Sequence, residues 1–291
     1  ESASVVANAA IGGTNSLGAV NLGASSELDL GNYTLAATSV TLDELSILDV
    51  GTGTVSGDVV GASDGVGTVN FTGDNSLGGN LGADGAALAL VDVATGKTVT
   101  AGANNIDAFA VNVNDESSLT LTSGALIGDV TLGASASLSS ESGDVTGDVT
   151  LGSSASFSLG SGALSGTVDG SSEDTGVVNL TATNTIAEGT YLGGANGLAE
   201  VNVGDVAITA NESIKAATVH VGGGESGSLT LAAAKSVTGD VVIDSGATFT
   251  LGNGSSVSGT IDGSAEDTGT LEIAESASVV ANAAIGGTNS L

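Results

Sequence analysis

Short alternating patterns of apolar and polar residues recur about every 19 residues along the chain. Each unit holds an apolar pair in alternate positions, a second such pair and a single apolar residue, before the next unit starts. In one copy these are Val149 and Leu151, Phe157 and Leu159, Leu164, and the next start at Val168. Alternating side chains point to opposite faces of a strand, so the pattern predicts about three short, half-buried strands per unit.

The starts of these units can be followed through the chain, with three steps longer than the rest. The starts are Val20, Val40, Val59, Val91, Val111, Val130, Val149, Val168, Val201, Val219, Val241 and Ile261. The long steps follow Val59, Val168 and Ile261, and each is entered through a related segment that begins at Ser56, Ser165 or Ser258. We expect each long step to be one looped turn or two short turns.

We call this repeating order of apolar positions the frame. The frame predicts an all-β chain folded as a parallel β-solenoid of about 19–20 residues per turn, because one turn cannot bury its own apolar face and stacked turns can. Gly, Ser, Asp and Asn lie between the expected strands, where they tolerate the tight bends of corners. Helices are disfavoured because no stretch keeps the i, i+3, i+4 pattern. An antiparallel sandwich would also use short strands, but it does not require a fixed frame.

The two ends of the chain carry the same sequence. Residues 1–17 and residues 275–291 both read ESASVVANAAIGGTNSL, which sets a period of 274 residues. A recent tandem duplication explains this identity, although a chain wrapped to imitate a repeat would show it too. We expect 1–291 to form a single continuous solenoid with sub-repeats beginning near residues 56, 165 and 258, and to be continued by further copies. About 12 to 15 turns per period, at about 4.8 Å each, give a rod of about 58 to 72 Å.

Composition narrows the classes of function. The 33 acidic residues face three Lys and no Arg, for a formal charge of −30. Nucleic-acid binding is excluded by this balance, because phosphate contacts depend on Lys and Arg. The absence of Cys excludes disulfides and thiolate metal sites. No segment resembles a signal peptide or a membrane span of about 18 or more apolar residues, so we expect no direct membrane insertion and place any secretion signal outside this sequence.

Acidic loops at the long steps are the candidate metal sites. The DGSxEDTG pattern supplies Asp169, Glu173 and Asp174 in one copy, and Asp262, Glu266 and Asp267 in another. Ca²⁺ prefers six to eight oxygen ligands from carboxylates and carbonyls in a loop. The third copy has Val60 and Gly65 in place of two of the carboxylates. We therefore weigh Ca²⁺ binding at these loops against a simple solvated turn, and we expect no required cofactor.

The sequence offers few residues that could form a catalytic site. The single His220 lies between Val219 and Val221, where other units have Asn or Thr, and we expect it to face solvent in a polar ladder. Paired carboxylates could serve a glycoside hydrolase, but Tyr33, Tyr191 and four Phe offer few aromatic platforms for a sugar. We expect no enzyme activity, no catalytic residues and no cofactor-binding residues.

In its 19-residue frame, with segments such as GDVTLGASASLSS from Gly128 and GDVTLGSSASFSL from Gly147, the chain resembles repeat regions of large bacterial surface proteins. Filamentous haemagglutinin-like adhesins and autotransporter passenger domains are the families concerned. The resemblance implies an extracellular or cell-surface location, a rod-like form and a role in adhesion, aggregation or matrix. It carries over no functional residues.

Two functions follow as expectations. The first is a structural repeat unit of an extracellular fibre, stalk, sheath or biofilm-matrix filament, whose partner is another copy stacked end to end or bundled. The alternative is the stalk of an adhesin that presents a separate glycan- or protein-binding module. A regular outward face favours the first, because specific binding would call for a distinctive patch.

Overall fold

The computed structural model describes residues 3–224 and 226–291. In these residues every regular secondary-structure element is a β-strand. Contacts divide the chain into unit 1, Glu1–Gly147, and unit 2, Asp148–Leu291. The strands of unit 1 are β1 (Ser4–Val6), β2 (Leu17–Leu22), β3 (Glu27–Asp29), β4 (Leu35–Leu42), β5 (Ile47–Val50), β6 (Val55–Gly61), β7 (Thr68–Phe71), β8 (Asn75–Ser76), β9 (Leu88–Val93), β10 (Thr98–Gly102), β11 (Ile106–Val113), β12 (Ser118–Leu121), β13 (Leu126–Leu132), β14 (Ser137–Ser140) and β15 (Val145–Thr146). Those of unit 2 are β16 (Val149–Leu151), β17 (Ser156–Leu159), β18 (Leu164–Ser165), β19 (Thr167–Gly170), β20 (Val177–Leu180), β21 (Asn184–Ile186), β22 (Tyr191–Leu192), β23 (Leu198–Val203), β24 (Ala207–Ala210), β25 (Ile214–Val221), β26 (Ser228–Leu231), β27 (Ser236–Ile243), β28 (Thr248–Leu251), β29 (Ser256–Val257), β30 (Ile261–Gly263), β31 (Thr270–Ile273) and β32 (Val280–Ala281).

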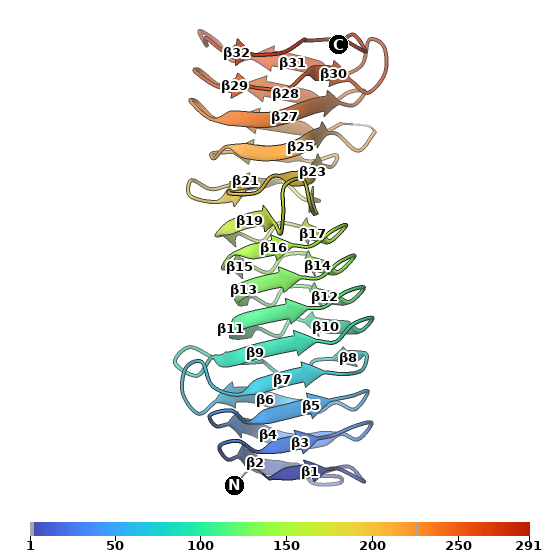
Figure 1. The fold of residues 1–291 in the computed structure, drawn as a ribbon, viewed down its shortest axis with the longest axis vertical. Coiled ribbons are helices and arrows are strands. Elements are labelled where there is room, and N and C mark those ends of the chain that lie inside the picture. Colours follow the sequence, from blue (N-terminus) through green and yellow to red (C-terminus); the bar gives the residue numbers. More distant parts are fainter. Residues whose placement is uncertain (1–2, 225) are drawn as a thin grey trace. The chain divides into compact units, whose positions relative to one another are not determined.

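The predicted parallel β-solenoid is confirmed. The strand pairs are parallel, and each strand pairs with the strand one turn further along the chain, as the stacked arrows of each unit show (Figure 1). The fold has about 14 turns. Val20 pairs with Val40, and Val111 pairs with Val130, as the frame predicts.

Unit 1 has three faces, each a ladder of stacked strands. Face 1 carries Val20, Val40, Val59, Leu81 and Ile106 in succession. Face 2 carries Leu28, Leu48, Val69, Val91 and Val111. Face 3 carries Leu35 and Val55 in its lower part, and Val99, Leu119 and Leu138 in its upper part. Leu28 and Val55 are 7% and 9% exposed, Val20 is half-buried, and the others are at most 3% exposed, so the core is a set of apolar columns.

The long step in unit 1 differs from the expectation. The frame aligns Val59 with Val91, but Val91 stacks on Val69 of the next face, while Val59 stacks on Leu81. The step therefore spans one turn and one additional face, rather than one looped turn or two short ones. As a result, the first pair of the frame moves from face 1 to face 2, and the second pair moves from face 2 to face 3.

Unit 2 repeats this shift. Val168 stacks on Leu192, while Val201 stacks on Val178 of the next face. The next long step begins in the same way, because Ile261 stacks on Ile285 and Leu271 stacks on Phe249. A long step thus adds one face in both units where it can be followed to its end.

Corners between the faces explain part of the Gly and Ser content. At one corner Leu45 lies in the left-handed region with a φ of 56°, and its side chain is 74% exposed. The Ser46 amide donates to the Asp43 carbonyl oxygen over 3.0 Å, and the buried Ser46 hydroxyl donates to the same oxygen over 2.7 Å. Gly96 and Gly246 take the place of Leu45 at equivalent corners, with φ of 69° and 79°.

Candidate functional site

The three acidic loops share one backbone form. Residues 61–67, 170–176 and 263–269 each follow a buried strand and turn the chain into the next face. Gly65, Asp174 and Asp267 occupy the same place in the three loops, with φ of 70°, 57° and 54°. The left-handed region favours Gly and is tolerated by Asp. The exchange of Asp for Gly at this place is therefore explained by backbone conformation alone.

In the loop at 170–176, the three sequence-predicted carboxylates have different surroundings. Asp169 Oδ2 accepts a hydrogen bond from the Ala195 amide over 2.9 Å. Glu173 forms an ion pair with Lys215, whose Nζ lies 3.0 Å from Oε1. Hydrogen bonding from Lys215, and then from the Gly197 amide, lowers the pKa of Glu173. Asp174 is exposed on the turn itself.

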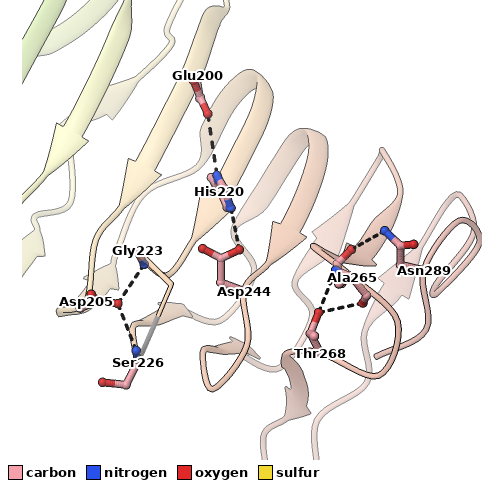
Figure 2. Close-up of polar contacts among 10 residues, drawn as sticks. Glu200, Asp205, His220, Gly223, Ser226, Asp244, Ala265, Thr268 and Asn289 are labelled. Atoms are coloured by element: carbon pink, nitrogen blue, oxygen red, sulfur yellow. Dashed lines mark hydrogen bonds and ion pairs between the residues drawn. The ribbon is translucent and has the colours of Figure 1, made fainter.

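The loop at 263–269 makes similar contacts with the turn above it. Asp262 Oδ1 accepts from the Thr288 amide over 3.2 Å. The Ser290 hydroxyl lies 3.2 Å from Glu266 Oε2 and 2.7 Å from Asp267 Oδ1. The loops at 170–176 and 263–269 are each also held from above by an asparagine, because Asn196 donates to the Gly170 carbonyl and Asn289 to that of Gly263, over 2.8 and 3.0 Å. Figure 2 shows the second of these contacts beside the Ala265–Thr268 turn.

These contacts bear on calcium binding. Among the described residues, no group of three or more His, Cys, Asp or Glu side chains is placed to hold a metal ion. Lys215 competes for Glu173, Asp169 and Asp262 accept from backbone amides, and Glu266 and Asp267 contact the Ser290 hydroxyl. Asp169 Oδ1 is buried and has no hydrogen-bond partner in the described part of the chain, so one donor oxygen is available there. Calcium binding at these loops stays a prediction.

A cluster of three carboxylates lies at the loop at 61–67, and the frame did not identify it. Asp64, Asp84 and Asp107 lie close enough together that their charges interact. Burial raises the pKa of Asp107, and the charges of Asp64 and then Asp84 raise it further. Asp107 follows Ile106 as Lys215 follows Ile214. A repulsive pair in unit 1 thus stands where unit 2 has an ion pair.

His220 lies in the polar ladder that the sequence predicts, since it stands in register with Asn202. It is only partly exposed, and it has partners that the frame did not reveal. Its Nε2 lies 3.0 Å from Asp244 Oδ1, and its Nδ1 lies 4.0 Å from Glu200 Oε1 (Figure 2). The two carboxylates lie on opposite sides of the ring, so the arrangement fixes the imidazole between neighbouring turns.

A second ion pair joins turns of unit 2. The Glu212 side chain is buried and accepts from Lys235 Nζ over 3.0 Å, from the Ser213 amide over 3.1 Å and from the Gly189 amide over 3.2 Å. The Lys235 hydrogen bond is the largest cause of a lowered pKa at Glu212. This pair therefore fastens residue 189 to the turn above it.

No family model, curated protein or solved structure matches this chain. In the residues that the structure describes, no helix is long and apolar enough to cross a membrane.

Proposed function

We propose that this chain is a structural repeat unit of an extracellular fibre, stalk, sheath or matrix filament on a bacterial surface, stacked end to end with further copies. The extracellular location rests on the resemblance to haemagglutinin-like adhesins and autotransporter passenger domains.

The observation that carries the proposal is the place of the repeated 17-residue segment in the ladders. Ile285 pairs with Ile261, which precedes it. Ile11 holds the same position of the 274-residue repeat, and it pairs with Leu35, which follows it. In a tandem array, a single copy of the segment would pair on both sides. The stack of parallel strands would then continue from one period into the next without a break.

Electron microscopy of the secreted protein tests this function. The nine regular steps count as nine turns, and three long steps of one and a third turns add four, provided that the third matches the other two. Thirteen turns at about 4.8 Å each predict an axial repeat of about 62 Å. Filaments with this repeat support the proposal, whereas short particles that never exceed one chain in length contradict it. A globular head on each rod would favour the adhesin stalk instead.

A further inference from the structure

One face of each unit is rich in outward hydroxyl side chains, and in unit 2 this ladder ends at the charged Glu272, which pairs with Thr250. In unit 1 these lie on β8, β10, β12 and β14, and they are Ser76, Thr98, Thr100, Ser118, Thr120, Ser137 and Ser139. In unit 2 they lie on β21, β24, β26 and β28, and they include Thr185, Thr209, Ser228, Thr230, Thr248 and Thr250. We call each set the hydroxyl face of its unit. None of these strands contains a charged residue, although the chain has a formal charge of −30.

The hydroxyl side chains stand in register. In unit 1, Thr100 pairs with Ser76 below it and with Thr120 above it. In unit 2, Thr209 pairs with Thr185 and Thr230. Neighbouring strands lie about 4.8 Å apart, and alternate residues of a strand about 6.6 Å apart. Each hydroxyl face is therefore a flat, regular array of small side chains.

In unit 1, the side chains that flank each face can be compared before and after the long step. Before the long step of unit 1, the second apolar pair of the frame lies on face 2 and is flanked by Glu27, Asp29 and Asp49. After it, the second pair lies on face 3 and is flanked by Ser and Thr. Face 2 then receives the first pair, with Asp92 and Asp129 beside it. Acidic residues therefore flank face 2 of unit 1 both before and after the long step, and face 1 carries Asp58 and Asp107 as well. In unit 2 the hydroxyl side chains follow the frame instead: Ser156 and Ser158 flank the second pair on a ladder that continues to Glu200, and after the long step Thr209 flanks the second pair on the separate ladder of β24.

We propose that the hydroxyl face is the surface through which two copies of this chain associate side by side. On the other faces, close approach would bring carboxylates together, and like charges repel. The hydroxyl faces can meet without that cost, because small identical side chains in register can interdigitate between paired sheets. The purpose of this contact rests on the proposed filament function, but its test does not, since a lateral pair can form without a filament.

The size of the face sets the strength expected. Four strands of four residues cover about 250 Å², whereas a stable interface buries roughly 800 Å² per partner. One face therefore gives weak association. Copies joined in an array would add their faces and bind more tightly than any single one.

Sedimentation velocity of the chain, at 0.1 M and 1 M NaCl in matched samples, tests the proposal, since the Debye length falls from about 10 Å to about 3 Å. We expect concentration-dependent association in high salt. Thr120→Asp and Thr120→Lys should each weaken it at least tenfold, because either charge would be buried in the contact. Thr131→Asp, on acidic face 2, is the matched control and should leave association unchanged.

Small-angle scattering separates this contact from end-to-end stacking, because lateral pairing increases the cross-section and stacking increases the length. Association that Thr120→Lys strengthens would reflect net charge alone and would overturn the proposal. So would association that survives both Thr120 variants, or a chain that stays monomeric in high salt at millimolar concentration. Filaments that lengthen but never widen would overturn the lateral contact and leave the filament function standing.

Discussion

Replacing Asn70 with Asp tests the face assignment at the long step. Asn70 stands in register between Asp49 and Asp92 on face 2, and its amide donates to Asp49 Oδ1 over 2.7 Å. The frame read from the sequence instead places Val60 in line with Asp92. A new carboxylate will therefore be costly at position 70 if the structure is right, and at position 60 if the frame is right.

The magnitude follows from the ladder spacing. Two unit charges about 4.8 Å apart repel by about 0.9 kcal/mol at the dielectric constant of water and by about 3.5 kcal/mol at an effective value of 20. These side chains are partly exposed, so we use the lower limit, and two neighbours cost about 2 kcal/mol. Loss of the Asn70 hydrogen bond adds about 1 kcal/mol. Asn70→Asp should destabilise unit 1 by about 3 kcal/mol at low salt.

Urea unfolding in 0.05 M and 1 M NaCl measures this effect and separates its parts, because only the repulsion is screened by salt. Val60→Asp is the matched control. Position 60 pairs with Thr41, and the equivalent residues Asp169 and Asp262 are tolerated in unit 2, so we expect a change of at most about 0.5 kcal/mol. A large loss with Val60→Asp and a small one with Asn70→Asp would refute the stacking of Val91 on Val69.

Four further outcomes are expected. Leu45→Gly should raise the free energy of unfolding by about 0.5 to 1 kcal/mol, because a left-handed Leu is strained, and an unchanged urea midpoint would contradict this. Asp107→Asn should stabilise the protein at pH values above the raised pKa of Asp107, where the natural side chain is charged. The two proteins should become equally stable as pH falls below the ordinary carboxyl pKa, which melting temperatures measured across this pH range would show. Glu212→Gln should destabilise at neutral pH, and the difference should shrink as pH falls through the lowered pKa of Glu212, since the Lys235 pair is lost on protonation; a pH-independent difference would point to packing instead. Calcium binding predicts a higher melting temperature with CaCl₂ that Asp169→Asn reduces; no response to CaCl₂ or chelator would mean that the acidic loops are solvated turns.

Much of the fold could be predicted from the sequence because apolar alternation directly reports which side chains enter a core. The regular turns, such as Val111 on Val130, needed nothing else. The shift of one face could not be predicted, because Leu81 is a lone apolar residue among Gly, Asn and Ala and gives no strand signal. A frame that skips from Val59 to Val91 fits the same sequence equally well.

The candidate site was predicted less completely because its contacts join distant turns. Glu173 and Lys215 are 42 positions apart, so no local pattern connects them. Asp107 had one available signal, since it follows Ile106 as Lys215 follows Ile214, but its neighbours depend on the shift of faces. His220 and Asp244 lie 24 positions apart, close to one turn, and a ladder drawn through the correct faces would have suggested the contact.

The additional face in each long step has a genetic consequence. A three-faced coil returns to its starting face only after three such steps, and the 274-residue period contains three long steps. Duplicating one third of the period would shift every later residue by one face, while duplicating the whole period keeps every residue on its own face. Unequal recombination within the gene would therefore be tolerated in whole periods, and we expect alleles to differ by multiples of 274 codons.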